Sequence, residues 1–343
     1  MPQRLQAFFT EACMTTTLST EPEIPEQEPS RTSVFSLRNL DSDMQLRVRK
    51  LHVIDVRWNW IALFWPVVWI VSATFIIHAP ASPFGLFVKI LCALAIGMAI
   101  QAMAILMHEA LHGNLFRDTR RDRIAAFLFG IPAFFSGEAY RVAHLNHHRY
   151  TRTDKDQDEI GNLCQSKRLY RILFYAWFVL GTLFYFFIVP WKAMNVGSPT
   201  ARRRIIAEYS AMLLVYLIAI AATLSSGNGL ALLWCWLIPA QIAMMASNIR
   251  GLSEHLCTSK DEVWTRTRTT KSNWFVSFTM LNLNYHLEHH LFPGVPWYNL
   301  QKLHILLQSI YQERDVFIQK SYVAYAWRAF RYGPEQTIRD FSK

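Results

Sequence analysis

The stretch Leu86–His112 reads LFVKILCALAIGMAIQAMAILMHEALH, an apolar run that ends in two histidines. A helix needs about 20 mostly apolar residues to cross a bilayer, and Leu86–Met107 has that length and composition. His108 and His112 are four residues apart, so on a continuing helix they share one face. Gly113-Asn114 then offers a helix stop. The stretch predicts a membrane-spanning helix that presents two imidazoles at one boundary of the bilayer.

Apolar runs of spanning length recur along the chain. Hydrophobic residues make up 52% of the 343 residues and charged residues only 17%, whereas soluble domains average about 25% charged. This composition predicts an all-α integral membrane protein. The run Ile124–Phe135 is too short to span, and we expect it to lie in the interface or to re-enter. The remaining candidate spans are Trp58–Ile77, Leu169–Val189, Ile206–Leu224 and Leu230–Ser247.

The charges of the loops predict the orientation. Ala79–Gly85 and Ser225–Gly229 carry no charge, which suits the outer face, whereas Gly113–Arg168 and Trp191–Arg204 are rich in basic residues, which suits the cytoplasm. With both basic loops inside, the run after Arg168 enters and leaves on one face or lies in the interface. We therefore expect four transmembrane helices in two hairpins, interfacial helices, and a cytoplasmic histidine-rich cap, with both termini inside. The alternative with five spans places Lys192 and three consecutive arginines outside.

Three parts of the chain are expected. Residues 1–57 form an N-terminal cytoplasmic segment, partly disordered because Thr15–Ser33 is rich in Thr, Ser, Pro and Glu. Residues 58–305 form the membrane domain, and residues 306–343 form a cytoplasmic tail. The formal net charge of +10 suits anionic lipid headgroups. Nucleic acid is not expected as a partner, because the basic residues are scattered between apolar segments.

Nine of the 12 histidines fall in three short boxes and one further position. Residues at i, i+3 and i+4 of a helix share a face, so each box projects two or three imidazoles together. Imidazole suits iron, zinc, copper and nickel, and a zinc site takes about four or five ligands, so nine histidines imply at least two metal ions. The boxes are His108/His112, His144/His147/His148 and His286/His289/His290, and His255 follows the last apolar run.

The first box also matches the HExxH motif, in which two histidines of a helix bind zinc and a glutamate acts as the base. A membrane zinc metalloprotease that uses His108, Glu109 and His112 is therefore an alternative. It leaves the other seven histidines without a role, and no acidic third ligand stands out in a later span. If the histidines instead bind two metal ions, Glu109 either accepts a hydrogen bond from a ligand histidine or has a structural role.

The boxes resemble those of the membrane fatty acid desaturase superfamily, whose pattern is HxxxH, HxxHH and HxxHH. The third box also stands in a family-like context, from Asn284-Tyr285 to Pro296-Trp297, and the resemblance covers roughly Trp58 to His304. It implies a non-haem di-iron centre held by the nine histidines, with dioxygen as co-substrate and oxidation of unactivated C–H bonds. It also implies an external electron donor, a ferredoxin-like or small haem protein, because no flavin or haem site is visible in the chain.

The resemblance leaves the substrate open. The expected reaction introduces a double bond into a fatty acyl chain of a membrane lipid. The alternative is hydroxylation or ketolation of a carotenoid or another lipid on the same scaffold, since the two reactions use the same ligands. The position of oxidation depends on tunnel shape, which no motif reports.

Residues near the boxes have supporting roles in this interpretation. Metal-bound imidazoles usually donate their second N–H to a carboxylate or carbonyl, and Glu254, Glu288 and Asp154, with the nearby Asp156 and Asp158, are placed to accept it. Asn284 resembles a position close to the metals in some members of the family. His304 is expected at the surface or in packing, and His52 and His78 are expected to be structural. The residues expected to dock an acidic electron donor are Arg117, Arg120, Arg121, Arg123 and Arg202–Arg204.

Overall fold

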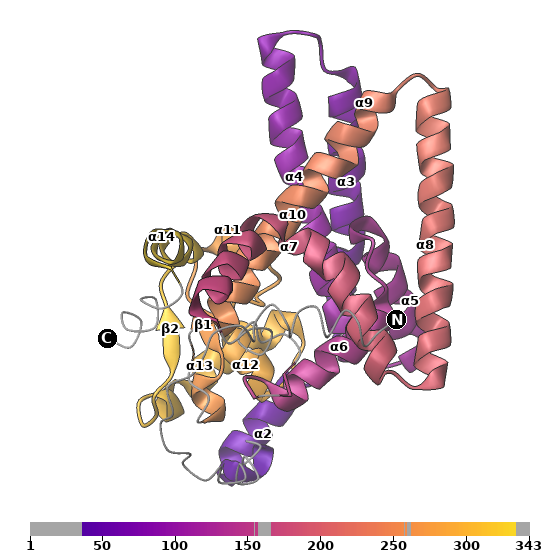
Figure 1. Cartoon of the computed structure of the whole chain (residues 1–343). Coiled ribbons are helices and arrows are strands. Elements are labelled where there is room, and N and C mark those ends of the chain that lie inside the picture. Colours follow the sequence, from indigo (N-terminus) through magenta and orange to yellow (C-terminus); the bar gives the residue numbers. More distant parts are fainter. Residues whose placement is uncertain (1–35, 154, 157–165, 257, 259–261, 334–343) are drawn as a thin grey trace.

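The computed structural model describes residues 36–153, 155–156, 166–256, 258 and 262–333 of the chain. These residues are almost entirely helical, with one sheet of two parallel strands (Figure 1). The strands are β1 (Arg268–Thr270) and β2 (Phe317–Gln319). The helices are α2 (Ser42–Leu51), α3 (Ile61–His78), α4 (Pro83–Leu111), α5 (Thr119–Gly130), α6 (Gly137–Tyr150), α7 (Lys167–Val196), α8 (Pro199–Ser225), α9 (Gly229–Leu232), α10 (Ile238–His255), α11 (Trp274–Thr279), α12 (His286–Leu291), α13 (Leu300–Tyr311) and α14 (Tyr322–Tyr332).

Four helical segments of the described chain are long and apolar enough to cross a membrane. Two are the single helices α4 and α8. The other two are composite, since a 3-10 turn lies between α2 and α3, and a π-helical turn at Leu233–Leu237 joins α9 to α10. The expected all-helical membrane fold with four candidate spans is therefore observed. The segments are Ser42–His78, Pro83–Leu111, Pro199–Ser225 and Gly229–His255.

The four segments differ in how far the protein covers them. In α4, 61% of the apolar window is buried, compared with 22%, 11% and 17% in the other three. Helix α4 packs against α3, α5 and α10, whereas α8 stands at the edge of the molecule (Figure 1). On α8, side chains such as Leu214 and Ile218 remain exposed, as suits contact with lipid tails. Because α4 is the central helix, the first histidine box at its end lies inside the protein.

Helix α7 contains the run Leu169–Val189, for which the loop charges predict entry and exit on one face or a position in the interface. It lies obliquely across the lower half of the molecule, whereas α3, α4 and α8 stand more upright (Figure 1). It packs closely on α10 at Gly181, where an added Cβ would lie 2.4 Å from Asn248 Nδ2. The same Asn248 Nδ2 donates a hydrogen bond to Trp177 O at 3.2 Å. Any larger residue at 181 would have to displace the Asn248 side chain, so glycine permits this close crossing of α7 and α10.

Local signals place the first two histidine boxes. Helix α4 ends at Leu111, and Gly113 follows with a φ of +73°, a left-handed conformation that glycine adopts readily. The predicted helix stop is therefore confirmed. Ser136 caps α6, because its Oγ accepts a hydrogen bond from Ala139 N at 3.0 Å. Helix α6 then carries the second box in its last turns.

The later elements pack on the end of the bundle that carries the histidines. Strand β1 pairs with β2, with Arg268 opposite Phe317, and α12 contacts β1. Tyr325 Oη of α14 donates to Leu252 O of α10 at 3.0 Å. Helix α13 passes through residue 305, and beyond it β2 pairs with β1 and α14 contacts α10. The expected disorder at Thr15–Ser33 falls outside the described residues.

Candidate metal centre

The nine histidines come together from four helices. Box one lies at the end of α4, box two in α6, His255 at the end of α10, and box three in α12. The five-histidine group has its ligand atoms within 4.8 Å of one another, and a second set lies beside it. The five-histidine group is His108, His112, His144, His148 and His289, and the four-histidine group is His147, His255, His286 and His290.

Boxes two and three each serve both groups. His144 and His148 belong to the five-histidine group, whereas His147 of the same helix belongs to the four-histidine group. Box three divides in the opposite way, because His289 joins the five-histidine group while its box partners join the other. Adjacent residues of a helix point in different directions, so an HxxHH box can supply two neighbouring sites.

The ring nitrogens lie at distances that suit shared coordination. In the five-histidine group, the Nε2 atoms of His144 and His148 are 2.9 Å apart, and those of His148 and His289 are 3.2 Å apart. In the four-histidine group, the Nε2 atoms of His255 and His286 are 2.7 Å apart. Metal–nitrogen bonds of about 2.0–2.1 Å place neighbouring ligand atoms roughly 3 Å apart. The donor set and its spacing therefore fit metal ions in both groups.

Burial keeps these imidazoles neutral. It lowers the pKa of His112 to about 4. Burial, reinforced by neighbouring imidazoles, also holds the pKa of His144 and His289 well below the ordinary value for histidine. A neutral imidazole has a nitrogen lone pair that a metal ion can use. The cluster is therefore set to bind cations at neutral pH.

Two carboxylates lie next to the Nδ1 atoms of histidines in the four-histidine group. Asp156 Oδ1 lies 2.9 Å from His147 Nδ1, and its other oxygen accepts from Arg152 N at 2.8 Å. Glu254 Oε2 lies 3.4 Å from His286 Nδ1, and Tyr322 Oη donates to Glu254 Oε1 at 2.9 Å. Asp156 and Glu254 thus lie beside ring nitrogens of boxes two and three. Asp154 and Asp158 fall outside the described residues.

Glu288 takes a different role from the one predicted. It lies between the histidines of box three, yet its carboxylate contacts side chains of β1 and α13 and not the histidines of the box. Its Oε2 accepts from Thr269 Oγ1 at 2.5 Å, and its Oε1 lies 2.5 Å from His304 Nδ1 and accepts from Tyr311 Oη at 2.7 Å. The position on α12 explains the error, because the histidines occupy one face and Glu288 the other.

The same contact corrects the prediction for His304. This residue is buried on α13, with 4% of its surface exposed, and pairs with Glu288. A surface position is therefore wrong, and its packing role includes a polar contact. The sequence could not reveal the partners, because Thr269, His304 and Tyr311 lie 16 to 23 residues from Glu288 without a recognisable motif.

The remaining predicted residues have local partners. Asn284 Nδ2 donates to Thr270 O at 2.9 Å, while its buried Oδ1 has no hydrogen-bond partner in the described chain. His52 Nδ1 lies 3.0 Å from Val48 O, and His78 is exposed at the end of α3. These two therefore stay outside the site, as expected.

Glu109 has partners that do not suit a catalytic base. It is fully buried, and its Oε2 accepts from Trp297 N at 2.9 Å and from Asn114 Nδ2 at 3.3 Å. Its Oε1 lies 3.5 Å from His108 Nδ1. The carboxylate thus connects the end of α4 to the segment after box three. It is a structural and supporting group, which removes the main attraction of the metalloprotease alternative.

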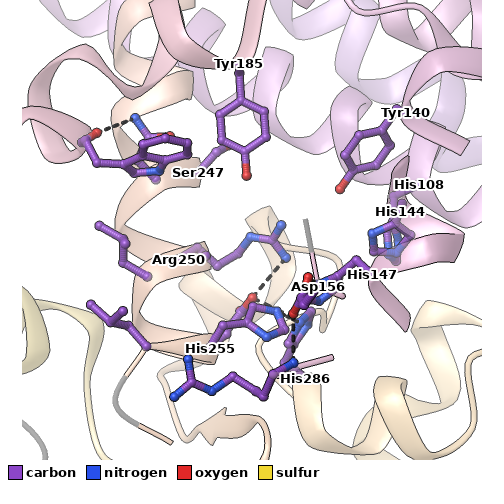
Figure 2. Close-up of a pocket in the computed structure, with 17 residues that line it drawn as sticks. His108, Tyr140, His144, His147, Asp156, Tyr185, Ser247, Arg250, His255 and His286 are labelled. Carbon is purple, nitrogen blue, oxygen red and sulfur yellow. Dashed lines mark hydrogen bonds and ion pairs between the residues drawn. The ribbon is translucent and has the colours of Figure 1, made fainter. Parts of the chain in front are cut away.

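A cavity of about 90 Å³ opens beside both histidine groups. His108 and His144 line it from the five-histidine group, and His147, His255 and His286 line it from the four-histidine group (Figure 2). A molecule in this cavity would therefore contact both groups at once.

The fold and the histidines define a multi-pass membrane protein with two adjacent groups of potential metal ligands. Comparison with known families gives the next step. The fatty acid desaturase family model matches residues 84–322, and the chain belongs to this family. The resemblance read from the three boxes is thereby confirmed.

Individual relatives are distant. The chain is 26% identical over 231 residues to dihydrorhizobitoxine desaturase of Bradyrhizobium elkanii. This match covers 62% of the present chain and 65% of that protein. It is 22% identical over 258 residues to a fatty acid desaturase of Bacillus subtilis (strain 168), covering 68% and 72%. It is 27% identical over 231 residues to sphingolipid delta(4)-desaturase DES1 of Drosophila melanogaster, covering 63% and 64%. The matches to the first and third relatives span less than two thirds of those proteins.

Proposed function

We propose that this protein is an oxygen-dependent desaturase that introduces a double bond into the hydrocarbon chain of a membrane lipid, most simply a fatty acyl chain. The observation that carries the proposal is the division of nine buried or half-buried histidines into two adjacent groups beside one cavity. Membership of the fatty acid desaturase family supports it. So do the names of the three relatives, all of which are desaturases.

The nine histidines would hold two iron ions, one in each group. Iron would supply dioxygen activation and the oxidation of an unactivated C–H bond, which no amino-acid side chain can perform. The all-imidazole spacing of the five-histidine group supports one ion. His255, His286 and His290 support the second, together with His147.

The protein's own residues would hold the ligands in place and keep out water. Asp156 would fix the ring of His147, which lies at hydrogen-bonding distance, and Glu254 would act on His286 as a nearby charge at 3.4 Å. The Thr269–Glu288–His304–Tyr311 contacts anchor α12 between two of its histidines. Burial of both groups would shield the reacting carbon from bulk solvent.

Electrons would come from an external donor that docks on the basic surface formed by the starts of α5 and α8. Burial raises the pKa of Glu138, but Arg141, Arg123 and Arg204 together outweigh it and hold the pKa below its ordinary value. The two basic segments of the sequence therefore act on one carboxylate. A second cavity of about 360 Å³, lined by His112, Arg117 and Arg123, leads from this surface to the five-histidine group.

The donor would be acidic, a ferredoxin-like or small haem protein, and it would reach the protein from the cytoplasm. A labelling experiment in intact cells tests this orientation. Single cysteines at Ser82 or Ser226 should react with an impermeant probe from outside, and a cysteine at Ser198 should not. Labelling at Ser198 would place the start of α8, and the docking surface, on the wrong side.

Lipid analysis tests the reaction. Extracts from cells that express the wild type and the His289→Ala variant should differ by a lipid that has lost two hydrogens. A lipid that has gained one oxygen would indicate hydroxylation instead. Unchanged acyl lipids with altered pigments would indicate a carotenoid substrate.

Elemental analysis of the purified, anaerobically reconstituted protein tests the metal. Iron should approach two ions per chain. A single zinc ion without iron would favour the metalloprotease.

A further inference from the structure

Arg268 and Arg250 lie near the metal centre, and they differ in their partners. Arg268 of β1 is fully buried, donates from Nη1 to the carbonyls of Ser253 and Leu256, and lies over the rings of Phe317 and Tyr325. It joins the end of α10 to the cap. Within the described chain, Arg250 of α10 does not join two elements in this way. Its Nε and Nη1 have no hydrogen-bond partner, and the nearest acidic oxygen, Glu254 Oε2, lies 3.5 Å from Nη1.

Arg250 belongs to the wall of the cavity beside the histidines. Its side chain is 15% exposed, and its guanidinium points into the space that the histidines line (Figure 2). A guanidinium carries five N–H donors, and leaving buried donors unmatched is costly. An ionisable side chain within a candidate membrane span is by itself a reason to look for a functional partner. Within the described residues, Nε and Nη1 of Arg250 thus have no hydrogen-bond acceptor, although Glu254 lies nearby, and a ligand could supply one.

Other polar groups share this wall. The hydroxyls of Tyr140 and Tyr185 point toward the same space, from α6 and α7 (Figure 2). Asn248 also lines the cavity, and its buried Oδ1 has no hydrogen-bond partner in the described chain. A cavity built for the middle of a hydrocarbon chain would be apolar here, because burying the unmatched donors of Arg250 and the Oδ1 of Asn248 against methylenes is unfavourable. This wall instead suits a ligand with hydrogen-bonding atoms.

The polar wall is close to the metal ligands. One oxygen of Glu254 lies 3.5 Å from Arg250 Nη1 and 3.4 Å from His286 Nδ1. A group bound at Arg250 is therefore only one carboxylate away from the four-histidine group. The cavity that Arg250 lines, about 90 Å³ in volume, is also lined by His147, His255 and His286 of the four-histidine group.

We propose that Arg250 binds an oxygen atom at the polar end of the substrate, so that the protein oxidises an amphiphile close to its headgroup instead of in the middle of its chain. The inference rests on the proposed desaturase function and names the substrate class. The bound group is a carboxylate or an amide carbonyl. Because Glu254 already lies beside Arg250, the site does not require a negatively charged ligand, and the two forms share the acceptor oxygen that the guanidinium needs.

Binding of short probes tests the proposal without turnover. Calorimetric titration of the purified, metal-loaded protein with hexanoate and with hexanamide should give saturable binding of at least one probe. Arg250→Lys keeps the charge but loses the planar set of donors, and it should bind about tenfold more weakly. Tyr185→Phe removes one hydroxyl and should weaken binding by a few-fold. Tyr175→Phe, on the same helix but outside the cavity, should bind as the wild type does.

Absence of saturable binding of either probe to the wild type would overturn the proposal. So would equal binding by the wild type, Arg250→Lys and Tyr185→Phe. This measurement does not depend on desaturation. If cells that express the wild type and His289→Ala show identical lipids, the proposed function fails, while the binding result still decides the role of Arg250.

The position of oxidation gives a second test. Mass spectrometry with chemical cleavage at the double bond should place the modification within the first few carbons from a carbonyl or hydroxyl of the product. Arg250→Lys should raise KM more than it lowers kcat, because the contact is to a part of the substrate that does not react. A modification in the middle of a long chain would overturn the inference and leave the desaturase function intact.

Discussion

The two histidine groups differ in the carboxylates that lie beside their imidazole rings. In the four-histidine group, Asp156 lies at hydrogen-bonding distance from His147, 2.9 Å, and Glu254 lies 3.4 Å from His286. Beside the five-histidine group, the described carboxylate Glu109 lies 3.5 Å from His108 without a hydrogen bond to the ring, and its other oxygen accepts from Trp297 N and Asn114. A carboxylate that accepts a ring N–H fixes the ring and makes it a better donor. The groups therefore offer similar ligands but unequal support, and we expect them to bind metal unequally.

Removing one ligand from each group gives the largest expected effect. His289→Ala takes a ring from the five-histidine group, and His290→Ala takes the adjacent ring from the other. Either change should lower turnover by more than about a hundredfold, because loss of a supporting residue alone costs about ten- to a hundredfold. Elemental analysis should show about one ion fewer per chain in each variant. The protein should still insert, since its apolar helices are unchanged.

The same two variants can also contradict the division of the histidines into two groups. If both lose both ions to the same extent, the nine histidines act as one cooperative centre and the division has no energetic meaning. If His290→Ala keeps its full metal content and activity, its assignment as a ligand is wrong.

Changing the supporting carboxylates should have a smaller effect. Asp156→Asn keeps the shape and the acceptor for Arg152 N but weakens the contact to His147, so metal affinity or activity should fall about ten- to a hundredfold. Glu109→Gln should change metal affinity much less, because its main bonds go to Trp297 and Asn114. Metal-competition titrations of both variants measure the contrast. Equal losses would show that the two groups are supported alike.

The sequence predicted the ligands more fully than their surroundings. Helical spacing at His108/His112, and the apolar run before them, were enough to place box one at the end of a span, because both are local properties. The division of each HxxHH box between two groups depends on how α6 and α12 face each other, which spacing alone does not determine. Contacts such as Tyr322–Glu254 join residues 68 positions apart, and no motif records them. Arg250 was missed because a single arginine carries no pattern.

The contact between His304 and Glu288 predicts an effect on stability. His304→Ala leaves the buried Glu288 carboxylate without one of its three partners, which should cost about 1–3 kcal/mol. His78→Ala, at an exposed helix end, is the matched control and should change little. Thermal unfolding in detergent measures both. Activity of His304→Ala should fall less than in Asp156→Asn, because the lost contact anchors α12 from the side away from the ligands. An unfolding temperature equal to that of His78→Ala would show that the contact contributes nothing.

The smallest expected effect is on electron transfer, which should reach one histidine group before the other. The basic surface reaches His112 through the second cavity, so electrons are expected to arrive beside the five-histidine group. Arg123→Gln should slow reduction by an acidic donor a few-fold at low salt and flatten the dependence of the rate on ionic strength, because surface charges act mainly on association. Arg331→Gln, on α14 across the molecule from α5 (Figure 1), should leave both the rate and its salt dependence unchanged. Stopped-flow reduction at several salt concentrations separates the two variants. If Arg331→Gln slows reduction and Arg123→Gln does not, the donor binds on the side of the cap, and the five-histidine group is not the nearer point of entry.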